Sequence, residues 1–170
     1  MKTVFAALGI VILTVACQEN ESTKKSDFTG NESVYALQSG SVYSVDGTVT
    51  FKERLDGTAE VVVALSGTDG EVLHPVHLHL GDIATDGASV AALLNPVVGK
   101  TGKSETLLTI LADESPITYK QLTKLNACVK IHLSDSGPDQ NIVLAGGNIG
   151  EAAANNLSNG RLGVAVCKSE

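Results

Sequence analysis

The stretch that decides the fold is Leu73-His74-Pro75-Val76-His77-Leu78-His79, which holds three of the chain's four histidines. Apolar residues and histidines alternate through most of it, and a period of two is typical of a β-strand. Successive side chains of a strand point to opposite faces, so we expect His77 and His79 to share one face. Two imidazoles on one face can reach the same metal ion. The stretch therefore predicts both a strand and part of a metal site.

The fourth histidine, His132, ends a second apolar run that begins at Ala127. An imidazole from a neighbouring strand would complete a three-nitrogen site of the kind that copper or zinc prefers. The alternative is that each histidine is an ordinary hydrogen-bonded residue of the fold. That alternative requires separate polar partners for the imidazoles of His77 and His79, so we favour a metal.

Composition limits the fold and the possible partners. The chain has 170 residues, 43% of them hydrophobic and none of them Trp, which suits one domain with a normal core. Its net charge of −7 argues against nucleic acid and anionic membrane surfaces as partners. Seventeen glycines and many short runs of Val, Leu, Ile and Thr favour strands over helices.

Apolar runs between glycine-containing turns predict about eight strands, and thus an all-β, antiparallel Greek-key sandwich or barrel. Asp56-Gly57 predicts a tight hairpin, and Pro116 precedes one or two expected helical turns over 117–125. The glycine-rich segment 146–150 is expected to be a flexible loop near the site. The expected strands are Ser33–Ser39, Val42–Phe51, Thr58–Ser66, Leu73–Leu80, Val90–Val97, Ser104–Leu111, Asn126–Leu133 and Arg161–Cys167.

The N-terminus has the pattern of an export signal. Residues 1–16 combine Lys2 with an uncharged apolar run of signal-peptide length. The sequence Leu13-Thr14-Val15-Ala16-Cys17 resembles the lipobox of bacterial lipoproteins, although Thr14 holds the position where that family usually has leucine. The resemblance implies a lipid anchor on Cys17 in the bacterial cell envelope, at the outer membrane. The alternative is ordinary secretion with Cys17 left free or lost.

Residues 17–31 are polar and aperiodic, so we expect a flexible tether followed by a folded domain over 32–170. Export places Cys128 and Cys167 in an oxidising compartment. Because both lie in short apolar runs, a disulfide between two strands is one prediction, and two buried thiols are the alternative.

Four blocks of the sequence resemble copper/zinc superoxide dismutases. Leu73–His79, followed by Gly81-Asp82, is similar to the copper strand of that family, which reads Leu-His-Gly-Phe-His-x-His. The segments 45–51, 129–132 and 159–165 resemble its second strand, the strand with its last copper histidine and its closing Gly-Ser-Arg-Leu-Ala segment. The blocks occur in the family's order from about Val34 to Val166.

This resemblance implies roles for individual residues. His77, His79 and His132 would bind one copper ion, and His74 would support the strand through hydrogen bonds. Arg161 would hold superoxide beside the metal as the catalytic cation. Copper would cycle between Cu(II) and Cu(I) as superoxide is converted to oxygen and peroxide, because imidazole accepts both oxidation states. Three acidic residues could orient the ligand imidazoles from outside: Asp82, Asp135 and Asp139.

The zinc site of that family has no counterpart here. The stretch that should carry the bridging histidine reads Leu93-Leu94-Asn95-Pro96, and no histidine lies between His79 and His132. We therefore expect copper and no zinc. The bridging histidine also stores a proton in the family's cycle, so its loss weakens the expectation of fast turnover.

A second family shares part of the pattern. Chordin-type CHRD domains are also β-rich, and their His-Ile-His and Val-x-Val-His patterns are similar to the segments 77–79 and 129–132. Three functions follow from the two resemblances: a copper-only superoxide dismutase of the cell envelope, a copper-binding module, and a metal-free binding or structural domain. The expected partners are superoxide or a copper ion, the membrane through the anchor alone, and a second copy of the chain.

Overall fold

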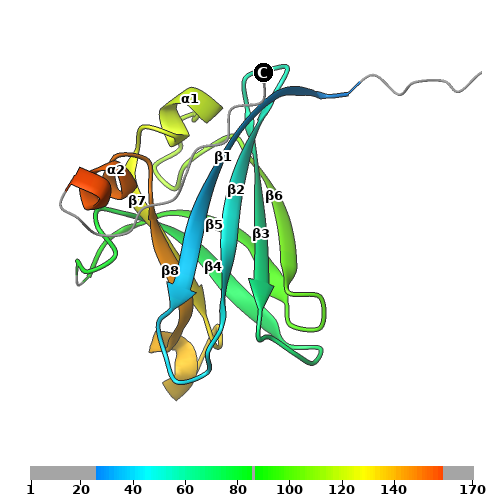
Figure 1. Ribbon diagram of the computed structural model, residues 1–170, viewed down its shortest axis with the longest axis vertical. Coiled ribbons are helices and arrows are strands. Elements are labelled where there is room, and N and C mark those ends of the chain that lie inside the picture. The colour runs from blue at the N-terminus through cyan, green and yellow to red at the C-terminus, as the bar shows by residue number, and fades with distance from the viewer. Residues whose placement is uncertain (1–25, 86, 159–170) are drawn as a thin grey trace, which may run out of the picture.

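The computed structural model describes residues 26–85 and 87–158, without the side chains of 156–158. These residues form a closed barrel of eight strands, each antiparallel to its neighbours (Figure 1). The strands are β1 Phe28–Ser39, β2 Asp46–Arg54, β3 Ala59–Ser66, β4 Leu73–Leu80, β5 Val90–Val98, β6 Lys103–Leu108, β7 Asn126–His132 and β8 Val143–Ile149. Three short helices complete the described chain: α1 Tyr119–Leu122, the 3-10 helix Pro138–Asn141 and α2 Gly150–Ser158.

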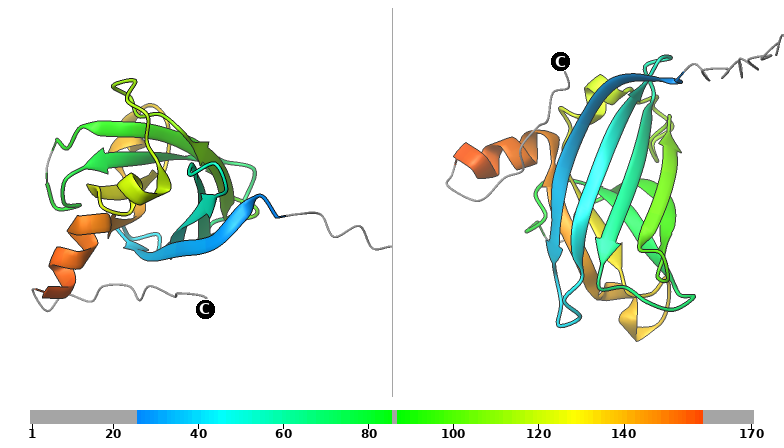
Figure 2. Two further views of the ribbon diagram at one scale, coloured as in Figure 1. Left: turned by 90° about the horizontal axis from the view of Figure 1, so that it is seen from above. Right: turned by 45° about the vertical axis from the view of Figure 1, so that its right-hand side comes forward.

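The strand order around the barrel is β1-β2-β3-β6-β5-β4-β7-β8. β4, β5 and β6 are paired consecutively, and β7 then returns to pair with β4. Three consecutive strands and a fourth that returns beside the first make a Greek key. Pairing of β8 with β1 closes the ring, which is visible from above in Figure 2. The predicted eight-stranded antiparallel Greek-key barrel is confirmed.

Alternate side chains of each strand fill the barrel. In β3, Ala59, Val61 and Val63 are at most 1% exposed, whereas the residues between them are half-exposed. The largest side chain with no more than 1% exposure is that of Phe51, whose ring lies 5.4 Å from that of the buried Tyr35. Full burial of one such side chain contributes about 1.5–3 kcal/mol, so this interior is the main source of stability.

The hairpin predicted at Asp56-Gly57 joins β2 to β3. The Arg54 backbone N–H donates to the Thr58 carbonyl at 3.0 Å, and Gly57 has a φ of 83°. A side chain at that φ would be strained, so glycine suits the turn. The Asp56 carboxylate accepts the Thr58 backbone N–H at 2.9 Å, which fixes the turn further.

Helix α1 is shorter than the expected 117–125. Thr118 and Gln121 form a capping box at its start, and each side chain bonds the other residue's backbone N–H. Tyr119 and Leu122 are buried, and the Tyr119 hydroxyl lies 2.9 Å from the Ser33 hydroxyl of β1. This helix therefore covers part of the barrel core instead of extending along the surface.

β1 begins at Phe28, so the expected tether over 17–31 is wrong in its last four residues. The polar sequence did not indicate a strand here, because the first residues of β1 are held by side-chain contacts and not by burial of apolar residues. The guanidinium of Arg54 lies 5.4 Å from the Phe28 ring, and the Asn31 amide donates to the Glu53 carboxylate at 2.7 Å. The cation–π contact and the hydrogen bond pair the start of β1 with the end of β2.

The segment 146–150, expected as a flexible loop, lies in β8 and at the start of α2. Its glycines allow close approach of strands. A Cβ on Gly147 would lie 2.1 Å from the Ala36 carbonyl oxygen, and one on Gly146 would lie 2.9 Å from the Val129 carbonyl oxygen. The two glycines therefore permit β8 to pack between its neighbours.

The barrel is closed by β8, a strand that the sequence did not predict, and the strand expected over 161–167 lies outside the described residues. Three predicted positions lie outside the described residues: Cys17, Arg161 and Cys167. Within 26–85 and 87–158, no helix combines the length and apolar character that crossing a bilayer requires.

Candidate metal site

Three histidines from adjacent strands converge, as the sequence predicts. Each of His77 and His79 on β4 and His132 on β7 offers a ring nitrogen, and these three nitrogens lie within 4.8 Å of one another. The ring centroids are 4.8 to 6.3 Å apart. The cluster depends on the pairing of β4 with β7, which brings together residues about fifty positions apart.

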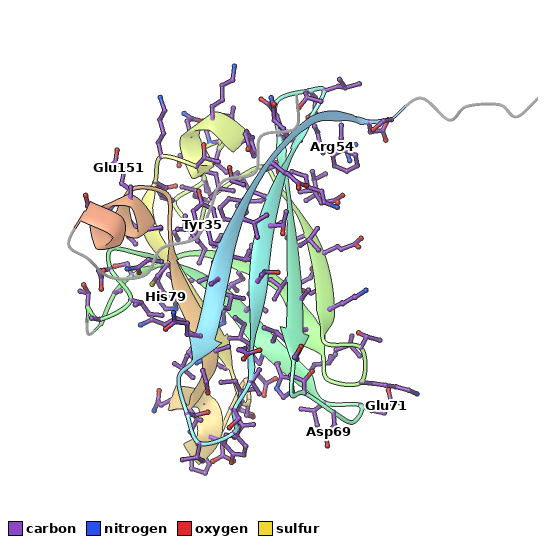
Figure 3. The ribbon with its side chains drawn as sticks, viewed as in Figure 1. Tyr35, Arg54, Asp69, Glu71, His79 and Glu151 are labelled. Carbon is purple, nitrogen blue, oxygen red and sulfur yellow. The ribbon has the colours of Figure 1, made fainter. Side chains whose placement is uncertain are left out.

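The cluster lies on the outer face of the barrel. Val76 and Leu78 of β4 and Ile131 of β7 point into the core and are at most 1% exposed. Because strand side chains alternate, the intervening histidines point outward. In Figure 3 His79 lies on the side of the barrel beside β8. Two loops border the cluster: residues 81–89 after β4 and residues 133–142 after β7.

Backbone carbonyls fix the orientation of two imidazoles. Nδ1 of His79 lies 2.9 Å from the Ala88 carbonyl oxygen, and Nδ1 of His132 lies 2.9 Å from the Gln140 carbonyl oxygen. A carbonyl can only accept, so each Nδ1 must carry the proton. Nε2 of each ring is then an unprotonated lone-pair donor, which is the form that binds metals.

Both of these Nε2 atoms are buried and have no hydrogen-bond partner among the described residues. Leaving a buried acceptor unsatisfied costs about 1–3 kcal/mol, and native structures rarely do so without a reason. A cation at the centre of the cluster would satisfy both lone pairs. The residues present therefore fit a metal ion.

The electrostatics of the cluster favour neutral rings. The pKa of His77 is lowered from its ordinary 6.5, mainly by burial and then by the nearby His132 and His79. The pKa of His132 is also lowered, again chiefly by burial, against the opposing effect of the Gln140 carbonyl. At neutral pH these imidazoles are ready to bind a cation without first releasing a proton.

His74 lies on the other face of β4, as its spacing predicts. It is buried, and its Nδ1 lies 3.2 Å from the Leu133 carbonyl oxygen at the end of β7. It does not belong to the cluster of three. This bond links the ends of β4 and β7, so His74 supports the pair of strands that positions the ligands.

Sequence reasoning missed the groups that orient the rings. Backbone carbonyls such as those of Ala88 and Gln140 have no residue-type signal, so no pattern could have identified them. None of the three acidic candidates is the hydrogen-bond partner of a ligand imidazole: Asp82 accepts a hydrogen bond from the Asn148 side chain at 2.6 Å, and Asp135 lies in a neighbouring groove. Asp139 lies in the 3-10 helix next to Gln140.

Lys130 and Cys128 lie on the same outward face of β7 as His132. Lys130 is the register partner of His77, and Cys128 is the register partner of His79. Cys128 is fully buried and has no disulfide partner among the described residues; burial is the main cause of its raised thiol pKa, and it is not among the converging ligand atoms. Since Cys167 lies outside the described residues, its pairing with Cys128 stays a prediction.

A shallow groove of about 230 Å³ adjoins His77 on the β5 side. Its walls are mostly apolar, and Asp135 is its charged residue. Leu93, the register partner of His77 on β5, is 71% exposed in this groove. A leucine side chain offers no ligand atom. All four histidines of the chain lie among the described residues, and three of them form the cluster.

Fold and site together define the class: an eight-stranded antiparallel β-barrel protein with three outward histidines that could hold a metal ion. Neither the protein-family models nor the curated proteins include a match to this chain.

Proposed function

We propose that this protein binds one copper ion through His77, His79 and His132. The observation that carries the proposal is the pair of buried, partnerless Nε2 atoms on His79 and His132, each set by a carbonyl on the other ring nitrogen. The third nitrogen comes from His77, which is half-buried and remains accessible from the groove. The three imidazoles provide the ligands, and the two bordering loops orient two of them.

Copper is favoured over other metals by the ligand type. The converging atoms are all imidazole nitrogens, with no carboxylate or thiolate among them. Imidazole suits both oxidation states of copper, and copper lies at the top of the affinity order for divalent first-row metals. The resemblance to copper/zinc superoxide dismutases supports the same choice, because these three histidines match its copper ligands.

We further propose that the copper site dismutates superoxide. Bound copper would supply one-electron chemistry, taking an electron from one superoxide, which leaves as O₂, and giving it to a second, which takes up two protons and leaves as H₂O₂. The three imidazoles would hold the ion, and Lys130 places a positive charge on the same face for an incoming anion. Leu93, which pairs with His77 on β5, has no proton to donate to the peroxide. Both protons would therefore come from water.

A non-enzymatic copper-binding or CHRD-type domain is the second candidate. Two observations favour it. The groove beside His77 presents apolar side chains and a carboxylate, which repels an anion. The β8 partner of His132 is Val143, an apolar residue. Arg161, proposed as the catalytic cation, lies outside the described residues. A measurement of superoxide dismutation is therefore needed to choose between the dismutase and the non-enzymatic domain.

The proposed setting is the bacterial cell envelope, with Cys17 as the lipid-anchored residue. This part rests on the lipobox-like sequence before Cys17 alone. Metabolic labelling with a fatty acid, compared between the wild type and Cys17→Ser, tests it. Equal labelling of the two proteins would exclude the anchor.

The copper proposal is tested by titrating the purified metal-free protein with Cu(II) against a chelator of known affinity. We expect one ion per chain, and loss of at least 100-fold in affinity for each of His77→Ala, His79→Ala and His132→Ala. His74→Asn serves as the matched histidine control, because it removes an imidazole that lies outside the cluster while its side-chain amide can still donate to the Leu133 carbonyl. Absence of binding at micromolar copper would exclude every copper-dependent function.

Turnover is tested separately, by superoxide decay over the copper-loaded protein. The dismutase proposal expects a rate above that of free copper, and a reduced rate for Arg161→Ala. A rate no higher than that of free copper would leave the binding function.

A further inference from the structure

The loop 81–89 after β4 is attached to β8 by a buried amide. The Asn148 side chain is 8% exposed. Its Nδ2 donates to Oδ2 of Asp82 at 2.6 Å, and its Oδ1 accepts the Ile83 backbone N–H at 2.7 Å. One side chain thus holds two consecutive residues of the loop through both of its polar atoms.

Asp82 organises the start of the same loop. Its Oδ1 accepts the Ala84 backbone N–H at 2.8 Å, and its carbonyl accepts the Thr85 backbone N–H at 2.9 Å. The Gly81 backbone N–H donates to the Asn126 carbonyl of β7 at 2.8 Å, which fixes the point where the loop leaves the barrel. The first five residues of the loop are therefore hydrogen-bonded to one another and to two strands.

The far end of this loop carries the carbonyl that orients a metal-site ring. Ala88 accepts the hydrogen bond from Nδ1 of His79 at 2.9 Å. The loop closes next to it, where the Leu80 backbone N–H donates to the Ser89 carbonyl at 2.9 Å. The position of the Ala88 carbonyl, and with it the direction of the His79 Nε2 lone pair, depends on a loop that Asn148 and Asp82 secure.

The register explains why Asn148 can do this. His79 of β4 pairs with Cys128 of β7, and Cys128 pairs with Asn148 of β8. The three side chains form a row across adjacent strands on the outer face, and the loop contacts both ends of this row, His79 through Ala88 and Asn148 through Asp82 and Ile83. A buried amide is costly unless it is fully hydrogen-bonded, and here the loop satisfies it.

We propose that Asp82 and Asn148 are positioning residues that set the copper affinity of the site by holding the Ala88 carbonyl against His79. The proposal rests on the proposed copper-binding function. Hydrogen-bonding partners of a ligand imidazole typically change metal affinity by about 10–100-fold when they are lost. Asp82 and Asn148 act one step further out, so we expect about 10-fold, at the lower end of that range.

The experiment is a reciprocal swap. Asn148→Ala and Asp82→Ala should each weaken Cu(II) binding about 10-fold, measured by chelator competition. In the double variant Asp82→Asn/Asn148→Asp, the new carboxylate can accept the Ile83 N–H and the new amide, whose oxygen can still accept the Ala84 N–H. Every hydrogen bond of the pair is thus available again, and copper affinity should return to within about 3-fold of the wild type. Asp82→Asn alone places two amides opposite each other, and Asn148→Asp alone places two carboxylates there. Neither single variant should recover the copper affinity of the wild type.

Asn31→Ala is the matched control, because Asn31 donates to the Glu53 carboxylate at 2.7 Å at the start of β1. This variant removes an equivalent amide–carboxylate hydrogen bond that lies away from the histidines. It should lower the melting temperature and leave the copper affinity unchanged. Long-range ¹H–¹⁵N NMR of the metal-free protein provides a second measurement. The Nδ1–H form of His79 should dominate in the wild type and the swap, and should be mixed with the other tautomer in Asn148→Ala.

The results separate the two proposals. A wild-type protein that binds no copper overturns the proposed function and this inference together. A wild type that binds copper, with Asn148→Ala binding equally well, overturns the inference alone. If Asn148→Ala does not fold, the inference is tested by comparing the double swap with Asp82→Asn. If these two folded variants bind copper with the same affinity, the inference is overturned.

Discussion

Lys130 on β7 lies directly opposite His77 on β4, so a lysine and a candidate ligand share the outer face at the candidate metal site. Lys130 is half-buried between neighbouring strands, and it forms no ion pair with any described residue. On β8 its partner is Gly146, against which the Ile83 side chain packs. A lysine ammonium placed there raises the local concentration of anions and opposes the binding of a cation.

We therefore expect Lys130→Gln to weaken azide binding to the copper-loaded protein by about 3- to 10-fold. Copper affinity itself should rise slightly, because a like charge is removed. Optical titration with azide at two salt concentrations measures the azide affinity and how far salt screens the attraction between Lys130 and the anion. Lys100→Gln is the control, since Lys100 pairs with the exposed Glu71 at 2.9 Å. Equal azide affinity in wild type and Lys130→Gln would rule out an electrostatic role.

The sequence predicted half of this site because the signal is local. The alternation in Leu73–His79 gave both the strand and the shared face of His77 and His79, and the structure places β4 over the predicted residues Leu73–Leu80. The contribution of His132 needed a tertiary fact, the adjacency of β4 and β7, which only the family resemblance suggested. The hydrogen bonds that the Ala88 and Gln140 carbonyls accept from His79 and His132 could not be predicted from the sequence, because every residue has a backbone carbonyl.

β8 was missed for a related reason. Glycine weakens a strand in isolation, so Gly146 and Gly147 indicated a loop. What makes them suitable for a strand is the approach of β1 and β7 on either side, and a single segment of sequence does not contain that information. The same reasoning explains why the predicted start of β1, Ser33, is later than the observed start, Phe28. The first residues of this strand are polar and pair with β2 through their side chains.

The lowered pKa values of His77 and His132 predict how stability depends on pH. Their folded pKa lies below the unfolded value of 6.5, so the unfolded chain binds protons first as pH falls. Stability of the metal-free protein is therefore complete above about pH 6.5 and decreases as the pH falls below that value. Carboxylates such as Glu53, whose pKa is lowered from 4.5, contribute only at lower pH.

Urea denaturation of the metal-free protein between pH 7.5 and 5 measures this dependence. The double variant His77→Gln/His132→Gln should flatten the curve in that window, because glutamine does not titrate there. Stability that increases on acidification through pH 6 would contradict the assigned direction.

Cys128 should behave as a packing residue and not as a ligand. Its thiol is buried with a raised pKa, and it lies outside the three converging nitrogens. Cys128→Ala should therefore keep copper affinity within about 2-fold and cost about 1–2 kcal/mol of stability through the cavity it leaves. Alkylation in denaturant without reductant, followed by mass spectrometry, should modify the peptide that contains Cys128. An unmodified peptide would instead support the predicted disulfide with Cys167.

Closure of the barrel depends on Gly147, which leads to the most severe prediction. A methyl group at this position would lie 2.1 Å from the Ala36 carbonyl oxygen and 3.2 Å from its carbon, both of them backbone atoms of β1. Since backbone cannot move aside as a flexible side chain does, Gly147→Ala must separate β8 from β1. Chemical denaturation should show a loss of about 3 kcal/mol or more, beyond the range of ordinary overpacking.

Gly70→Asn is the matched glycine control. Gly70 has a φ of 67°, and a Cβ there would meet nothing within 4 Å. Asparagine tolerates that backbone conformation, so the loss should stay below about 1 kcal/mol. Because β8 also pairs with the strand that carries His132, Gly147→Ala should weaken copper binding as well, whereas Gly70→Asn should not. If Gly147→Ala were as stable as Gly70→Asn, β8 could not be the strand that closes the barrel against β1.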